Sequence, residues 1–226
     1  MFSLDDPLEE FYRLAREERV LSGAVRTFRG LRLPRDPSLY EALVHAILGQ
    51  QLSVSAANTI KRRLIERSDS FLDVEGVELP CLPGPDALVA LGESGLRGVG
   101  ASGGKARSLL AIAQRERSGA FAASRFRRLS VARAVEALDA EPGVGRWTAE
   151  NALLRGVGRR DLFVAGDLGL RVALDRFGAV PRSAPETDAR AWGDRRYPGW
   201  GSYATLYLWR RLVAELAEER RGKPDG

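Results

Sequence analysis

The sequence has few of the residues that most often build catalytic and metal centres. Of its 226 residues, only His45 is a histidine and only Cys81 is a cysteine. A Ser-His-Asp or Cys-His nucleophile would therefore need His45, and a zinc site with several His and Cys ligands is excluded. One cysteine also excludes a disulfide framework and a four-cysteine iron–sulfur cluster. Any catalyst must rely on carboxylates, aromatic rings, arginines or backbone groups.

Lysine is also scarce, so arginine carries nearly all of the basic charge. Lys and Arg total 35 against 30 Asp and Glu, a formal net charge of +5, and the lysines are Lys61, Lys105 and Lys223. A basic excess favours phosphate-bearing partners such as nucleic acid. An excess of this size also fits a surface of solvated arginines, so the charge alone leaves both interpretations open.

Long apolar runs are missing as well. No segment of the sequence approaches the roughly 20 apolar residues that cross a bilayer. The first 20 residues are acidic and amphipathic, whereas a signal peptide would be basic and then apolar. We therefore expect an intracellular protein without membrane association.

The apolar residues recur with a helical period along almost the whole chain. Short Val/Leu runs between 71 and 82 have the composition of strands, but nothing supports a sheet. We predict an all-α fold of two helical lobes, 36–120 and 125–226, with a helix over 5–20 packing on the second lobe. Further helices are predicted from Asp36-Pro37 to about Gly49, from Ser55 to Leu64, after Ser102, after Ser130, from Leu168 to Phe177, and through Tyr203 and Leu212.

A glycine turn between two predicted helices has the chemistry of a phosphate-binding site. Residues 138–149 read LDAEPGVGRWTA, and Gly143 and Gly145 let another molecule approach the backbone closely. The helix that follows presents free N–H groups and the positive end of its dipole. Such a turn suits a DNA backbone bound without sequence readout. A purely structural turn is the alternative, since many helix pairs turn on glycine.

Three further segments accompany this turn in a fixed order. They read ALVHAILGQQLSV (42–54), FVAGDLGLR (163–171) and YPGWGSYATLYLW (197–209). Together with the turn, they resemble the helix-hairpin-helix (HhH-GPD) DNA glycosylase superfamily, and within it the AlkA and Mag branch of DNA-3-methyladenine glycosylases II. The resemblance covers roughly residues 36–212 and implies an active-site cleft between the lobes. Too few residues precede Asp36 for the N-terminal β domain of longer bacterial relatives, so the chain resembles a short form.

The resemblance implies that Asp167 is the catalytic aspartate. A carboxylate beside the anomeric carbon would stabilise the cationic sugar that forms as the base leaves, and would orient the attacking water. An alkylated purine is already cationic and leaves readily, so this chemistry needs neither histidine nor metal. Gly166-Asp167-Leu168 also has the pattern of a helix start, which predicts that Asp167 is an N-cap.

The resemblance also implies a base pocket and a hydrolytic reaction. Trp147 occupies the position of a lysine that forms a Schiff base in bifunctional relatives, and an indole cannot do so. Trp147 and Trp209 match aromatic positions where stacking and cation–π attraction hold a cationic purine; burial in the core is the alternative for both. Leu168 and Asn151 replace tyrosines of some relatives, which implies a more open pocket.

The DNA contacts implied by the resemblance lie in a loop and in the hairpin. A glycosylase must flip the damaged nucleotide out of the duplex and fill the gap, and Gln51 occupies the wedge position of relatives, with Leu52 as the alternative. Gly143, Gly145 and Thr148 are expected to hold a phosphate through N–H groups or the hydroxyl.

A monovalent cation, Na⁺ or K⁺, is the one ion that the resemblance allows. It would bind the backbone carbonyls of Asp139, Glu141 and Val144, between the hairpin and the phosphate. No other cofactor is required, and no iron–sulfur cluster is expected.

The resulting prediction is a monofunctional DNA glycosylase of base excision repair. It would remove 3-methyladenine and 7-methylguanine from double-stranded DNA as a cytoplasmic monomer associated with the bacterial nucleoid. One alternative is a related glycosylase for deaminated or oxidised bases. The other, from a different class, is a non-catalytic hairpin module that binds damaged or bent DNA, for which Asp167 and the two tryptophans would be unnecessary.

Overall fold

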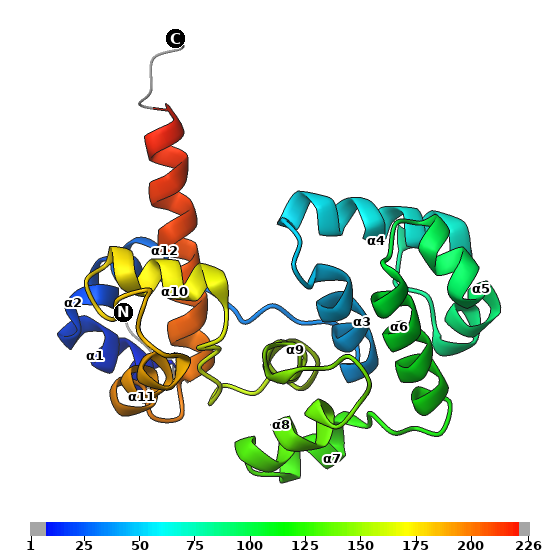
Figure 1. The fold of residues 1–226 in the computed structure, drawn as a ribbon. Helices are drawn as coiled ribbons and strands as arrows, with labels where there is room; N and C mark the ends of the chain where they lie inside the picture. The colour runs from blue at the N-terminus through cyan, green and yellow to red at the C-terminus, as the bar shows by residue number, and fades with distance from the viewer. Residues whose placement is uncertain (1–7, 222–226) are drawn as a thin grey trace. The chain divides into compact units, whose positions relative to one another are not determined.

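The computed structural model describes residues 8–221, most of which are helical (Figure 1), so the predicted all-α class is confirmed. The chain divides into two compact units. The central unit comprises residues 35–158, and the terminal unit comprises 8–34 together with 159–221. Within the described range, no helix combines the length and the apolar character that crossing a membrane would require.

The boundary between the units differs from the predicted one between residues 120 and 125. Residues 125–158 belong to the central unit, because α9 (Arg146–Ala152) and the π-helical turn η1 (Leu153–Val157) pack along α3 (Leu39–Gly49). Gly156 permits this close contact, since a Cβ there would lie 2.6 Å from the Cα of Leu39. A helical period along the sequence does not reveal such a long-range pairing.

The central unit is built around α3, which is apolar on nearly every side, as expected for a helix inside a core. Its start differs slightly from the prediction: Ser38, not Asp36, is the N-cap, and its side chain accepts a hydrogen bond from the backbone N–H of Glu41. The other helices of this unit are α4 (Val54–Ser68), α5 (Pro85–Gly98), α6 (Gly103–Glu116), α7 (Ala123–Arg128) and α8 (Val131–Asp139).

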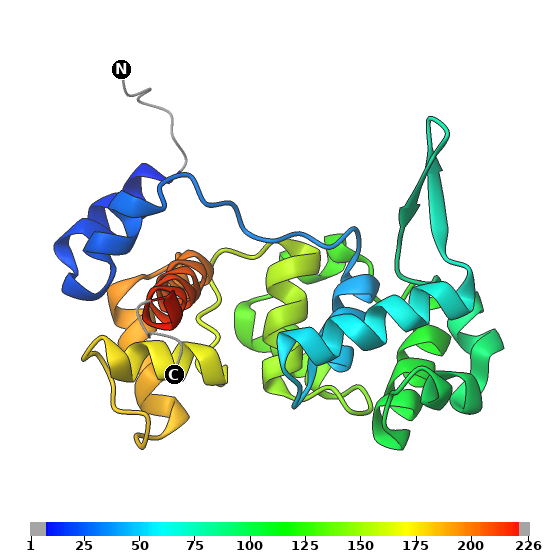
Figure 2. The ribbon, with the colours of Figure 1, turned by 90° about the horizontal axis from the view of Figure 1, so that it is seen from above.

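A small β-hairpin of the central unit corrects the expectation that no sheet forms. Strands β1 (Phe71–Val74) and β2 (Val77–Pro80) pair antiparallel, and Figure 2 shows the hairpin projecting from the helices of its unit. Glu75 and Gly76 both have positive φ, 53° and 82°, which is typical of the two-residue turn that matches the twist of a hairpin. All eight strand residues are exposed, so the hairpin adds nothing to the core.

The terminal unit begins with two helices where one is predicted over 5–20. Residues 5–7 lie outside the described part, and α1 (Glu9–Glu17) is followed by α2 (Arg19–Thr27). The break falls at Glu18, whose backbone is extended. This unit also contains α10 (Leu168–Arg176), α11 (Glu186–Arg196) and α12 (Gly201–Arg221).

Aromatic side chains of α1 and α12 pack together in the core of the terminal unit. The ring of Phe11 in α1 lies 5.3 Å from the ring of Tyr207 in α12, centroid to centroid, and both side chains are fully buried. The Tyr12 and Tyr207 hydroxyls are 3.3 Å apart. The N-terminal helix therefore packs on the C-terminal helices, as predicted, and α12 becomes the support for the loop that precedes α10.

Candidate functional site

Asp167 lies at the start of α10 and is held in one orientation by two hydrogen bonds. Its Oδ1 accepts from the backbone N–H of Leu170 at 2.8 Å, which confirms the predicted N-cap. The same oxygen accepts from the indole Nε1 of Trp209 at 2.8 Å. The carboxylate is half-buried, so it is both fixed and accessible.

One face of α12 positions the loop that carries Asp167. Ser202, Thr205 and Trp209 recur at helical spacing and therefore share a face. The Thr205 hydroxyl accepts from the backbone N–H of Val164 at 3.3 Å, and the Ser202 hydroxyl donates to the Leu162 carbonyl at 3.2 Å. Together with the Trp209 bond to Asp167, these contacts tie residues 162–167 to α12 at three points.

The predicted hairpin is present, with α8 and α9 joined by residues 140–145. Gly143 has φ +75°, and a Cβ there would lie 1.9 Å from Ser108 Oγ, so both the backbone and α6 require glycine. Gly145 is different: it caps α9 with φ −87°, and nothing lies within 4 Å of the place a Cβ would take. The space beside Gly145 is therefore open to another molecule.

The two glycines give a testable contrast. Gly143→Ala should lower the free energy of unfolding by about 1–3 kcal/mol, because it adds backbone strain and a clash. Gly145→Ala should leave stability within about 0.5 kcal/mol of wild type but weaken DNA binding, because the methyl group occupies the space beside the first N–H groups of α9. Urea denaturation and binding to a duplex containing an abasic-site analogue measure the two effects. Equal DNA affinity of Gly145→Ala and wild type would contradict a backbone approach at this glycine.

Thr148 is placed differently from the other predicted phosphate contacts. The whole residue is 2% exposed, and its hydroxyl accepts a hydrogen bond from Gln50 Nε2 at 2.9 Å. Its backbone N–H lies in the first turn of α9, where helix N–H groups lack partners within the helix. The Thr148 hydroxyl is thus already engaged within the protein, and the backbone N–H is the group that has no partner within its own helix.

The predicted wedge residues form the turn between α3 and α4. Gln51 is exposed and has φ +55°, a left-handed conformation that is uncommon outside glycine. Leu52 is 40% exposed and leaves an apolar tip next to Gln51. Both side chains are thus available to another molecule.

The two predicted pocket tryptophans belong to different units. Trp147 is half-buried in α9 of the central unit, where its carbonyl accepts from Asn151 Nδ2 at 3.0 Å. Trp209 is half-buried in the terminal unit beside Asp167. Neither ring is fully buried in a core, so both keep exposed surface. Leu168, which follows Asp167, is 62% exposed.

The carbonyls predicted to hold a cation lie at the end of α8 and in the hairpin turn. The Glu141 carbonyl accepts the backbone N–H of Val144 at 3.1 Å and keeps a second lone pair. Arg115 pairs with the Glu141 carboxylate at 3.0 Å, so its charge is compensated locally. Among the described residues, no group of three or more His, Cys, Asp or Glu side chains is placed to hold a metal.

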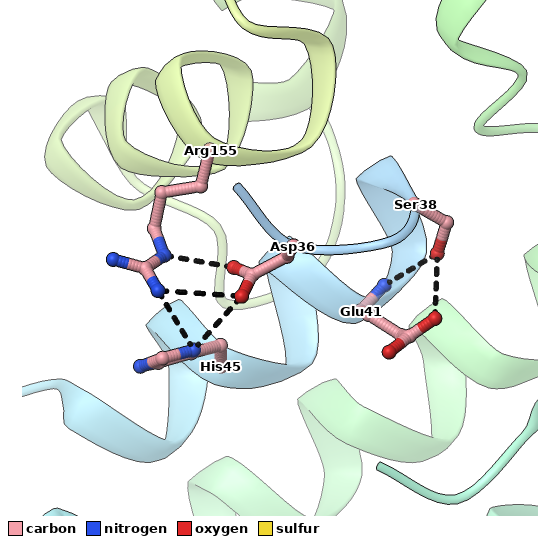
Figure 3. Close-up of polar contacts among 5 residues, drawn as sticks. All are labelled: Asp36, Ser38, Glu41, His45 and Arg155. Carbon is pink, nitrogen blue, oxygen red and sulfur yellow. Dashed lines mark hydrogen bonds and ion pairs between the residues drawn. The ribbon is translucent and has the colours of Figure 1, made fainter. Parts of the chain in front are cut away.

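A polar cluster in the central unit, not predicted from the sequence, joins the two ends of that unit (Figure 3). Arg155 Nε and Nη2 donate to the two carboxylate oxygens of Asp36 at 2.8 and 3.3 Å. Nδ1 of His45 lies 3.4 Å from Asp36 Oδ1. Burial raises the pKa of the Asp36 carboxyl, but hydrogen bonds with His45 and Arg155 outweigh it and hold the pKa well below its usual value. His45 is thus part of an ion-pair cluster that anchors the start of the unit.

Family comparison agrees with these features. Residues 44–193 match the model of the HhH-GPD superfamily base excision DNA repair protein. Since this match covers more than half of the chain, the chain belongs to the HhH-GPD superfamily of base excision DNA repair proteins. The predicted family is therefore confirmed, and the matched range includes the hairpin and the segment that carries Asp167.

Within this superfamily, the chain is similar to proteins named as 3-methyladenine DNA glycosylases. A DNA-3-methyladenine glycosylase of Bacillus subtilis (strain 168) is 28% identical over 211 residues, 93% of this chain and 69% of the relative. A 3-methyladenine DNA-glycosylase structure from Archaeoglobus fulgidus has a TM-score of 0.80 and 26% identity, covering 91% of this chain and 69% of that one. A Schizosaccharomyces pombe 3-methyladenine DNA glycosylase, solved with abasic DNA, has a TM-score of 0.72 and 26% identity, covering 89% and 94%.

Proposed function

We propose that this protein is a monofunctional DNA glycosylase that hydrolyses the N-glycosidic bond of alkylated purines in duplex DNA, with 3-methyladenine and 7-methylguanine as substrates. The orientation of Asp167 carries the proposal. The Asp167 carboxylate is half-buried, and the two hydrogen bonds that Oδ1 accepts, from the Leu170 N–H and from Trp209 Nε1, fix its orientation. The names of the relatives, all 3-methyladenine glycosylases, support the choice of substrate.

The proposed reaction needs one carboxylate and one water molecule. As the bond from C1′ to the ring nitrogen breaks, its electron pair leaves with the base and cancels the positive charge of the alkylated purine. The Asp167 carboxylate stabilises the cationic sugar that forms. Water then bonds to C1′ and loses a proton to Asp167 or to solvent, leaving an abasic site.

Hydrolysis without strand cleavage follows from the residues of the hairpin. A lyase of this superfamily type would need an amine for a Schiff base, and Trp147 at the start of α9 has none. The three lysines of the chain lie outside the hairpin sequence. We therefore propose that the abasic strand stays intact.

DNA binding in this proposal uses the central unit. The N–H groups at the start of α9, beside Gly145, bind a phosphate, while Gln51 or Leu52 enters the gap left by a flipped nucleotide. For the extruded cationic base, each unit offers the face of one half-buried tryptophan, Trp147 in the central unit and Trp209, beside Asp167, in the terminal unit. The abasic DNA bound to the S. pombe relative supports duplex DNA as the partner. One chain supplies every named residue, and we propose a cytoplasmic monomer acting on nucleoid DNA.

A monovalent cation fits the hairpin as a structural ion. Backbone carbonyls are ligands suited to Na⁺ or K⁺, and those of Asp139, Glu141 and Val144 lie in or beside one turn. When bound, the ion would add positive charge near the phosphate-binding N–H groups. The proposed hydrolysis does not depend on it.

A glycosylase assay across a panel of lesions tests the proposed function. Duplexes carrying 3-methyladenine, 7-methylguanine, hypoxanthine, 1-methyladenine and uracil are incubated with the protein, and free base and strand breaks are measured. We expect release of the first two bases with strands intact until alkali treatment. Preferred release of hypoxanthine or uracil would move the protein to the glycosylases of deaminated bases. Binding to abasic-site analogues without release of any base would assign a non-catalytic hairpin module.

A further inference from the structure

Gln50 connects two segments of the central unit that the proposed function uses separately. It is the C-cap of α3, immediately before Gln51 and Leu52. Its Nε2 donates to the Gly143 carbonyl and to the Thr148 hydroxyl, both at 2.9 Å. The primary amide has two N–H groups, so one nitrogen can make both bonds at once. Gln50 therefore links the turn between α3 and α4 to the hairpin between α8 and α9.

The Gly143 bond fixes a peptide plane in the hairpin. The plane between residues 143 and 144 is rigid, and its carbonyl and N–H point in opposite directions. Gln50 holds the carbonyl, while the Val144 N–H on the other side donates to the Glu141 carbonyl at 3.1 Å. The peptide that precedes the phosphate-binding start of α9 is thus held from both sides.

The turn between α3 and α4, which contains Gln51 and Leu52, is also held in place. Lys105 Nζ from α6 donates to the Leu48 carbonyl at 2.8 Å, which fixes the last turn of α3. The Leu52 N–H donates to the Gly49 carbonyl at 3.3 Å. Ser53 caps α4, which follows directly. These bonds stay within the turn or reach α6, whereas the Gln50 side chain bonds directly to the hairpin.

We propose that Gln50 is a positioning residue that fixes the distance and angle between the wedge turn (residues 51 and 52) and the phosphate-binding hairpin. The inference rests on the proposed function and extends it: Gln50 touches no DNA and acts through Gly143 and Thr148. The distance between the phosphate site at α9 and the wedge turn is then fixed. The protein can therefore hold a phosphate and insert a side chain at a constant separation along the duplex. Loss of the link should affect insertion of the wedge more than retention of DNA.

Base extrusion gives the first test. Gln50→Met keeps the length of the side chain and removes both donors, and Gln50→Glu keeps its shape and replaces them with an acceptor. Gln114→Met, at an exposed site in α6, is the matched control. With 2-aminopurine placed beside the lesion, both Gln50 variants should lower the rate of unstacking about tenfold or more, since small misplacements of reacting groups have effects of this size. Affinity for undamaged duplex should change less than about threefold, within the effect of a lost uncharged contact.

A double-mutant cycle separates positioning from general destabilisation. If Gln50 acts through the wedge turn, truncating the wedge by Leu52→Ala or Gln51→Ala should reduce unstacking much less in the Gln50→Met protein than in wild type. Independent, multiplicative effects for both truncations would overturn the proposal. So would unstacking rates of Gln50→Met that match those of Gln114→Met.

Hydrogen exchange of the free protein provides a test without DNA or catalysis. Exchange of the Leu52 amide should become about tenfold faster in both Gln50 variants and stay unchanged in Gln114→Met, because local opening governs exchange. Unchanged exchange, or loss of folding in both Gln50 variants, would overturn the positioning role. If wild type released no base, the proposed function would fail while this measurement still decided the role of Gln50. Asp167→Asn should unstack DNA at the wild-type rate, because it affects bond hydrolysis and not base extrusion. This variant therefore separates the two steps.

Discussion

Asp167→Asn should reduce the single-turnover release of 3-methyladenine from methylated duplex DNA by about 10²- to 10⁴-fold, as for the loss of a group that stabilises charge in the transition state. The substitution removes the negative charge and replaces one carboxylate oxygen by an NH2 group, while it keeps the size and shape of the side chain. An asparagine side-chain oxygen can still accept from the Leu170 N–H and from Trp209 Nε1, and asparagine is a good N-cap. The loop and the Trp209 ring should therefore keep their positions.

The other properties of this variant make the result specific to chemistry. Binding to a duplex with an abasic-site analogue should stay within about threefold of wild type, since uncharged contacts are retained. Asp175→Asn is the matched control, because Asp175 is an exposed aspartate of the same helix whose carboxylate accepts from the Arg182 N–H. Release by Asp167→Asn at the wild-type rate would contradict the assignment of Asp167.

Asp36→Asn should lower the free energy of unfolding of the central unit by about 3 kcal/mol at pH 7, the cost of breaking a largely buried ion pair from one side. The Asp36 side chain is 11% exposed and accepts a two-point hydrogen bond from Arg155. Without it, the guanidinium stays partly buried with its charge uncompensated. Urea denaturation of both proteins measures the difference.

The pH dependence of this difference identifies its origin. The pKa of Asp36 is below its usual value in the folded protein, so the carboxylate stabilises the fold above its unfolded pKa of about 3.9. This contribution is lost as the pH falls from there toward the folded pKa. The stability difference between wild type and Asp36→Asn should therefore shrink below about pH 4. Burial raises the pKa of the neighbouring Glu41, and the Asp36 charge adds to this shift, so the substitution should also bring the Glu41 pKa back toward its usual value.

An exposed ion pair supplies the control for Asp36. Asp86 pairs with Arg117 at 2.9 Å, with side chains 82% and 57% exposed. Asp86→Asn should change stability by less than about 1 kcal/mol, because exposed pairs contribute little in water. Equal losses for Asp36→Asn and Asp86→Asn would show that the cluster in Figure 3 does not anchor the central unit.

Features that depend on neighbouring residues could be predicted from the sequence. The Asp167 cap needs a short polar side chain directly before a helix, and the hairpin needs glycine between two helices. In both cases the signal spans only a few positions. The helical class follows from an apolar period that continues along the chain.

Features that depend on distant contacts could not be predicted. Gln50 meets Gly143 across 93 positions, and Asp36 meets Arg155 across 119. Nothing near Gln50 distinguishes it from the exposed Gln51 that follows it. The boundary between the units depends on such a distant contact as well, the packing of α9 against α3.

Local backbone geometry explains why the β-hairpin and the position of Arg155 could not be predicted from the sequence. Residues 71–82 have the composition of strands, but the two-residue turn at Glu75 and Gly76 lacks the Asn-Gly or Asp-Gly sequence that is most typical of hairpin turns. Arg155 lies in the π-helical turn η1, whose wider hydrogen-bond spacing shifts side chains away from a continuous helical period. A helical pattern in the sequence therefore does not predict the ion pair of Arg155 with Asp36.

Release of free 3-methyladenine by the purified protein, with strand integrity followed in the same reaction, tests the proposed function most directly. A methylated duplex is incubated under single-turnover conditions with borohydride present, and free base, strand breaks and covalent adducts are measured. We expect free base, strands that break only after alkali, and no adduct. A trapped protein–DNA adduct would contradict hydrolysis. If the protein bound the duplex but released no free base, glycosylase activity would be contradicted.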